Sequence, residues 1–224
     1  VSVLAKRKKE EAAPLLETIM TLIGGILFIV SIVIVITAPL FVDLFTMPVE
    51  EGPGKQLVQA IAIRQLRIMA PMAVLAGLIG IGFGALNTAN VYWLPSISPL
   101  FSSTAVVAAI GIFYLQVGSK IGNQEYAMLG GTVLAGGTLV GALLQWFVQL
   151  AAQTKAGMGR IRLRFDFNQP AVKEVLKIMG PATFSSGMLQ INLYTDLFFA
   201  SFISTKVAPA LASAGLLVQT PLGI

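Results

Sequence analysis

Cysteine and histidine are absent from this sequence of 224 residues. Their absence excludes disulfides, thiolate or imidazole metal sites, and catalysis by a cysteine or histidine side chain. Charged residues are also scarce, at 11% of the chain against about 25% in an ordinary soluble domain. Hydrophobic residues make up 56% of the chain, which is more apolar surface than a soluble fold can bury. The sequence therefore predicts a membrane protein whose chemistry rests on Asp, Glu, Arg, Lys and amide side chains.

Long segments without charge predict several membrane-spanning helices. No charged residue lies between Glu17 and Asp43 or between Arg67 and Lys120, and one crossing needs about 20 apolar residues. The second segment is long enough for two crossings. Between them, the sequence NTANVYWLP at 87–95 has the amides, proline and interfacial aromatic residues of a turn. We expect an all-α, polytopic bundle of transmembrane helices, with spans at about 15–42, 67–86, 98–117, 128–151, 178–203 and 207–224.

The longest polar connection divides these spans into two groups. We expect residues 1–152 to form part of an N-terminal helical lobe, 153–170 to be a loop between lobes, and 171–224 to begin a C-terminal lobe. If the first span starts in the cytoplasm, most of the 15 basic residues lie on the cytoplasmic side, as the positive-inside rule requires. The loop is then cytoplasmic.

The inter-lobe loop contains the basic sequence GRIRLRFDFN. Its Arg160, Arg162 and Arg164 alternate with Ile161, Leu163 and other apolar residues. Positive charge next to membrane spans is explained by topology, and this argues against a nucleic-acid partner. The alternation could also indicate a short strand or a contact with anionic lipids.

Asp196 is the acidic residue expected deep within an apolar span. A carboxylate there costs roughly 2.5–3.5 kcal/mol on insertion scales. With Asn192 one helical turn earlier, it could bind a cation or a proton in a water-filled cavity. Alternatively, Asp196 could pair with Lys206 or lie near the outer interface.

Arg64 and Arg67 are three residues apart and therefore share one helix face, at the outer end of the span expected at 67–86. If they face a cavity, their guanidinium groups suit a diphosphate or another anionic head group. If they face lipid, they would only extend toward the interface.

Glycine pairs four residues apart predict close helix packing within the bilayer. Gly80–Gly84 and Gly137–Gly141 both have this spacing, which lets two helix backbones approach each other. The pairs indicate packing rather than a binding function.

Three blocks of the sequence can be compared with known membrane proteins. They are LRIMAPMAVLAGLIGIGFGALNTANVYWLPSISPLFSS at 66–103, IMGPATFSSGMLQINLYTDLFFASF at 178–202, and VSVLAKRKKEE at 1–11. In order and spacing they resemble the fourth and fifth helices, the seventh helix, and the cytoplasmic turn after the second helix of the MurJ/MviN family. The resemblance implies that this chain covers helices three to eight of a fourteen-helix protein and is a fragment truncated at both ends.

The resemblance also implies a fold and a function. The fold would be the two-lobed multidrug/oligosaccharidyl-lipid/polysaccharide exporter fold, and the protein a lipid II flippase of the bacterial inner membrane rather than an enzyme. Arg64, Arg67 and Asn87 would bind the substrate, and Asp196 with Asn192 would bind a coupling cation, Na⁺ in some members. Many members have an arginine in the eighth helix where this chain has Leu216.

Other functions remain as alternatives. A drug/cation antiporter of the same superfamily should have an acidic cavity, and a structural membrane subunit would tolerate loss of both arginines and of Asp196. A membrane-embedded transferase would need an acidic cluster to hold metal and phosphate, and the sequence has none. Neither the oligomeric state nor the particular lipid-linked substrate is indicated by the sequence.

Overall fold

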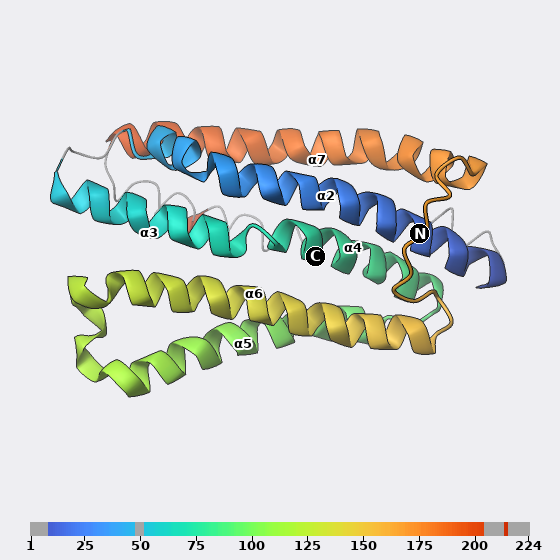
Figure 1. The fold of residues 1–224 in the computed structure, drawn as a ribbon, viewed down its shortest axis with the longest axis horizontal. Coiled ribbons are helices and arrows are strands. Elements are labelled where there is room, and N and C mark those ends of the chain that lie inside the picture. Colours follow the sequence, from blue (N-terminus) through green and yellow to red (C-terminus); the bar gives the residue numbers. More distant parts are fainter. Residues whose placement is uncertain (1–8, 48–51, 204–212, 215–224) are drawn as a thin grey trace.

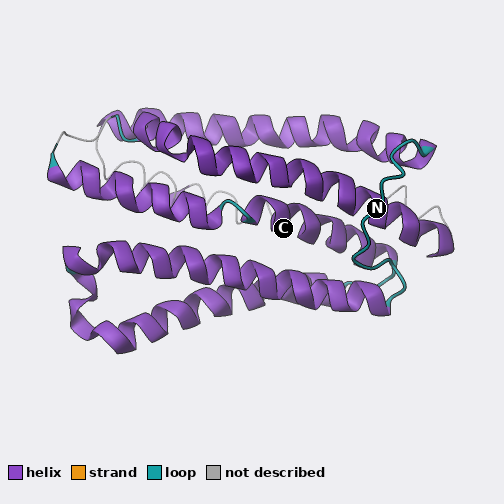
Figure 2. Ribbon diagram, viewed as in Figure 1, coloured by secondary structure: helices purple, strands orange, loops and turns teal. Residues whose placement is uncertain are grey.

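The computed structural model describes residues 9–47, 52–203 and 213–214. These residues form a bundle of long helices that run roughly along one axis, with no strand among them (Figures 1 and 2). The all-α membrane bundle expected from the sequence is confirmed. The span expected at 207–224 lies outside the described residues apart from 213–214. Leu216 and Lys206 lie outside them as well. The described helices are α2 (Lys9–Phe45), α3 (Pro53–Met69), α4 (Met72–Thr88), α5 (Trp93–Val117), α6 (Gln124–Lys155) and α7 (Pro170–Ile203), with a 3₁₀ turn at Gly118–Gly122.

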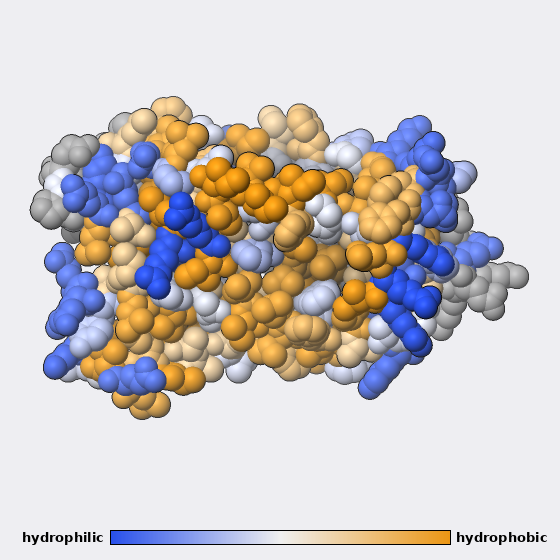
Figure 3. Space-filling view, in the orientation of Figure 1, coloured by the Kyte–Doolittle hydropathy of each residue, from blue (hydrophilic) through white to orange (hydrophobic). Residues whose placement is uncertain are grey.

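Three of these helices, α2, α5 and α6, are long and apolar enough to cross a membrane, and α3 with α4 forms a possible fourth span bent by 40°. Hydrophilic surface gathers mainly at the two ends of the bundle, and apolar surface covers much of its middle (Figure 3). The helix α7, which contains the span expected at 178–203, is as long as a span but is not among the helices apolar enough to cross a membrane; it contains the polar residues Gln190, Asn192 and Asp196.

The bend between α3 and α4 changes where the second span begins. Pro71 has no amide hydrogen, so the carbonyl group of Arg67, four residues earlier, loses its helical donor and the helix breaks. The helix before the break starts at Pro53 and packs along α2 and α6. The sequence from 53 to 66, expected outside the span, is thus helical and lies along α2 and α6, joined to α4 by the bend.

Close contact between α5 and α6 depends on the glycines of α6. A Cβ atom at position 141 would lie 2.7 Å from the carbonyl oxygen of Ser102, and one at position 137 would lie 2.7 Å from the Cβ of Ala109. The close packing expected at Gly137–Gly141 is thus confirmed. The same expectation is wrong at Gly80, where a Cβ would meet nothing within 4 Å.

A buried polar chain also joins α5 to α6. Because Pro99 lacks an amide hydrogen, the carbonyl oxygen of Pro95 has no helical donor from that position. The Ser98 hydroxyl donates to it at 3.0 Å and accepts a 2.7 Å bond from Nε2 of Gln149. Ser98 and Gln149 are fully buried, so these bonds satisfy groups that water cannot reach.

We expect Ser98→Ala to destabilise the bundle by about 1–3 kcal/mol, because both the Pro95 carbonyl and the Gln149 amide lose a buried partner. The measurement is thermal unfolding of the purified full-length protein in detergent, followed by circular dichroism. Ser96→Ala is the matched control, since Ser96 is exposed and bonds only locally to the Tyr92 carbonyl at 3.0 Å. Equal melting temperatures for the two variants would contradict a structural role for the chain.

Candidate anion-binding site

Arg64 and Arg67 lie together on α3. Both side chains are exposed, and with Ala60, Ile63 and Ile68 they line an open hollow of about 520 Å³. Figure 3 shows strongly hydrophilic atoms over α3, away from the ends of the bundle and flanked by apolar surface. The shared face expected from their spacing brings both guanidinium groups to one hollow.

The position of these arginines along the helix matters energetically. At 1.5 Å per residue, Arg67 lies roughly 20 Å along α3 from its start at Pro53. It is also beside Val35 of α2, well inside the span Glu11–Phe45. Neither arginine forms an ion pair with a carboxylate among the described residues. A cation at this depth needs water or an anion next to it.

The backbone of α2 holds Arg67 in place. Pro39 cannot donate to the carbonyl group four residues before it, which is that of Val35. The Nε–H group of Arg67 donates to this carbonyl oxygen at 3.4 Å. The other N–H groups of the guanidinium are directed elsewhere, as its planar fork requires. Arg67 therefore combines a structural bond with free capacity to bind an anion.

Sequence reasoning missed this link between Pro39 and Arg67. A proline within an apolar span leaves a carbonyl group without a donor, and a basic side chain at similar depth is a suitable partner. That combination is the signal that could have indicated the contact.

The structure places Asn87 away from the arginines. It lies in the last turn of α4, roughly 30 Å along the chain of helices from Arg67. Its carbonyl oxygen accepts a bond from the amide of Asn90 at 3.2 Å, within the turn before α5. Asn87 is therefore at the end of α4 that packs near the start of α2, and Arg64 and Arg67 lie on the other side of the bend at Pro71.

Asp196 and Asn192 lie one turn apart on α7, and both are exposed. Two residues further along α7, the ring of Phe198 packs edge-on against that of Phe45, at 5.8 Å between centroids. Phe45 is the last residue of α2, so Asp196 lies toward the end of the bundle at which α2 ends. No cluster of three acidic residues suited to a metal occurs in the described part of the chain.

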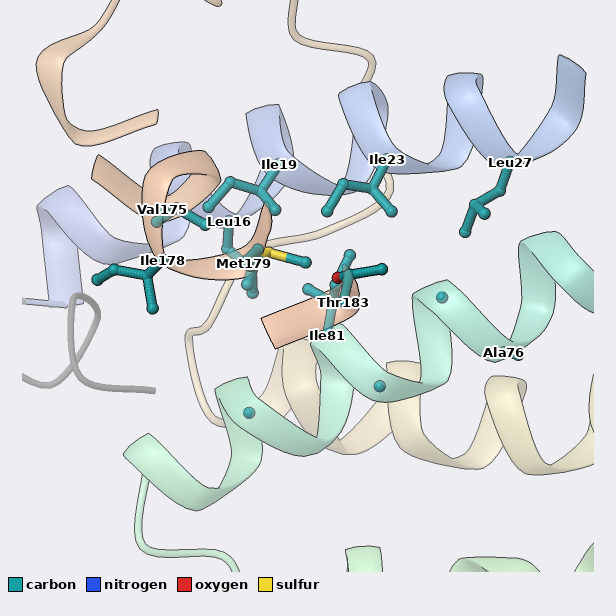
Figure 4. A pocket seen from close by; sticks show the side chains of 13 residues that line it. Leu16, Ile19, Ile23, Leu27, Ala76, Ile81, Val175, Ile178, Met179 and Thr183 are labelled. Atoms are coloured by element: carbon teal, nitrogen blue, oxygen red, sulfur yellow. The ribbon is translucent and has the colours of Figure 1, made fainter. Parts of the chain in front are cut away.

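A separate apolar cavity of about 480 Å³ lies between α2, α4 and α7. Figure 4 shows side chains from all three helices directed into it, including Leu16 and Ile23 of α2, Ile81 of α4, and Met179 of α7. Gly80 and Gly84 form part of its wall, which explains why Gly80 makes no close helix contact. The cavity was not expected from the sequence.

Comparison with known proteins places this arrangement in a family. The family model described as "Lipid II flippase MurJ" matches residues 1–224. The chain belongs to the MurJ family. A probable lipid II flippase MurJ of Synechocystis is 53% identical over 224 residues, which is all of this chain and 41% of that protein.

More distant MurJ relatives agree with this assignment. A probable lipid II flippase MurJ of Haemophilus influenzae is 27% identical across 90% of the chain and 38% of its own length. The lipid II flippase MurJ of Burkholderia cenocepacia is 32% identical across 72% of the chain and 30% of its own length. The chain thus spans about two fifths or less of each of these relatives, and it contributes part of the membrane domain of a MurJ protein.

Proposed function

We propose that the protein containing this chain is a lipid II flippase of the bacterial inner membrane and not an enzyme. The observation that carries the proposal is the pair of exposed arginines, Arg64 and Arg67, within a membrane span and without a carboxylate partner in the described structure. A lipid-linked diphosphate supplies the anion that such a pair needs. The relatives named lipid II flippase MurJ support the choice of lipid II.

In this proposal the substrate's polar head follows a path along α3 and α4. Asn87, at the cytoplasmic end, offers hydrogen bonds to the sugar head as it enters, and the two arginines bind the diphosphate in the outer half of the membrane. The apolar surface flanking the arginine hollow contacts the lipid chain. Two lobes that alternate between inward and outward openings would move the head between these places.

The coupling cation in this proposal is Na⁺, bound by Asp196 with help from Asn192. Both side chains are exposed on one stretch of α7, so further ligands from other parts of the full-length protein can reach them. Carboxylate and amide oxygens are ligands that hard cations prefer. The level of Asp196, near the outer end of α2, fits a cation that enters from outside.

The function is tested by complementation. We expect the full-length protein to restore growth and lipid II translocation in bacteria depleted of their own flippase. An Asp196→Asn variant should lose the sodium dependence of translocation, whereas Asp43→Asn, an exposed carboxylate change at the outer end of α2, should keep it. Failure of the well-expressed full-length protein to restore translocation would contradict the flippase and direct attention to drug/cation exchange. If translocation is restored and its sodium dependence is unchanged in Asp196→Asn, the cation site is contradicted but the flippase function is not.

A further inference from the structure

The inter-lobe segment 160–165 is held against α2 by hydrogen bonds between the backbone of the segment and side chains of α2. The amide of Arg160 donates to Oε1 of Glu17 at 3.0 Å. The amide of Arg164 donates to the Thr21 hydroxyl at 3.0 Å, and that hydroxyl lies 3.3 Å from the carbonyl oxygen of Arg162. Glu17 and Thr21 are one helical turn apart, and each accepts a hydrogen bond from a backbone amide of the segment.

These contacts determine the register of the segment. In an extended chain, alternate residues direct their amide and carbonyl groups toward the same edge. Here the backbone groups that face α2 are those of Arg160, Arg162 and Arg164. Just before the segment, Gly159 has φ 89°, and a Cβ there would lie 3.1 Å from the carbonyl oxygen of Ala13. A side chain at 159 would push the segment away from α2. The segment is therefore positioned by the fold and is not a free loop.

The fixed register exposes large apolar side chains next to positive charge. Ile161, Leu163 and Phe165 are 61%, 77% and 70% exposed. The side chains of Arg160 and Arg162 are exposed as well. Of the nearby carboxylates, Glu17 is buried and lies 3.9 Å from Nε of Arg164, while Asp166 accepts a bond from the amide of Gln169. The charge left facing outward is positive.

Two hollows adjoin the segment at the cytoplasmic end of the bundle. One, of about 630 Å³, is lined by Lys155, Arg160, Phe147 and Ile161, among others. The other, of about 350 Å³, lies between the segment, α2 and α6, and its wall includes Trp146. Each hollow combines basic groups with apolar and aromatic side chains. This combination matches the phosphate and the acyl chains of one amphipathic anion.

We propose that segment 160–165 with the end of α6 is a binding site for an anionic phospholipid of the cytoplasmic leaflet. Arg160 and Lys155 bind the phosphate, and the exposed apolar side chains of the segment contact the acyl chains. The site is independent of the substrate path, because Arg64 and Arg67 lie in the outer half of the membrane. An anionic lipid at this place would fasten the connection between the two lobes to the membrane surface.

Quenching of tryptophan fluorescence tests the site. The full-length protein in detergent micelles is titrated with phosphatidylglycerol that carries bromine on its acyl chains, and separately with brominated phosphatidylcholine. The signal of Trp146 is obtained by subtracting the same titration of a Trp146→Phe variant. We expect half-maximal quenching at a concentration at least fivefold lower for phosphatidylglycerol than for phosphatidylcholine.

A variant with Lys155→Gln and Arg160→Gln should reduce this preference to less than twofold. The side chains change, but the Arg160 backbone amide that bonds Glu17 remains, and the melting temperature checks that the fold is intact. Lys120→Gln with Lys55→Gln removes two charges from the opposite end of the bundle and should keep the preference. Equal quenching by the two lipids in the unmodified protein, or an unchanged preference in the Lys155 and Arg160 variant, would overturn the proposal.

Discussion

Replacing Arg67 with alanine is expected to weaken binding of a lipid-linked diphosphate by about 10- to 100-fold and to abolish rescue of flippase-depleted bacteria. A hydrogen bond to a charged group contributes about 1.5–3 kcal/mol, and Arg67 would supply such bonds to the diphosphate. Lipid II binding to the purified full-length protein and growth rescue are the two measurements. Arg67→Lys should recover only part of the affinity, because an ammonium group lacks the planar fork of a guanidinium.

The Pro39 contact allows binding and structure to be separated. Arg67→Ala also leaves the Val35 carbonyl without its donor, so we expect a loss of about 1 kcal/mol in stability. In a Pro39→Ala background the new amide can donate to that carbonyl, and the stability cost of Arg67→Ala should disappear. The binding defect should persist. Recovery of binding together with stability in the double variant would show that Arg67 has only a structural role.

Replacing Gly141 with alanine is expected to destabilise the pairing of α5 with α6 by about 1–3 kcal/mol, and Gly141→Leu by more. The new Cβ would lie 2.7 Å from the carbonyl oxygen of Ser102 and 2.9 Å from its Cα. Because these are backbone atoms, the helices must move apart rather than rotate a side chain. The Ser98–Gln149 hydrogen bond, about one turn away along α5 and two turns away along α6, would lengthen as well.

Gly136→Ala is the matched control for this change. It lies on the same helix, and its Cβ would meet nothing within 4 Å, so alanine there should leave stability unchanged or raise it slightly. Thermal unfolding of both variants of the full-length protein in detergent compares them directly. Equal melting temperatures for the Gly141→Ala and Gly136→Ala proteins would contradict the close approach of α5 and α6.

The two glycine pairs show how far a local pattern can predict structure. Gly80–Gly84 and Gly137–Gly141 have the same spacing, and each pair lies within a largely apolar helix. Both glycines of the second pair meet α5 closely, whereas Gly80 of the first pair meets nothing within 4 Å and lines an apolar cavity together with Gly84. In a bilayer, lipid tails are as apolar as the side chains, so the sequence carries little information about which helix face meets protein and which meets lipid or a cavity.

The sequence likewise predicted only part of the candidate site, because the arrangement of the helices cannot be read from it. Arg64 and Arg67 could be found because charge is rare in an apolar chain, and their shared face follows from helical periodicity. Their depth depended on the break at Pro71, which joins α3 to the second span. The distance of Asn87 from the arginines, and the level of Asp196 set by the Phe45–Phe198 contact, depended on how the helices are arranged.

By itself, the sequence determined that this protein is a helical membrane bundle, which family it resembles, and which of its rare charged residues are candidates for a binding site. These are properties of composition, of apolar segment length and of local order, and each can be read along a single chain. The tertiary structure alone decided that Arg67 bonds the carbonyl freed by Pro39, that Ser98 and Gln149 meet in the interior, and that the segment 160–165 is held by Glu17 and Thr21. Each of these contacts joins residues far apart in sequence, and it exists because a backbone or side-chain polar group in an apolar setting must find a partner on whichever helix lies beside it.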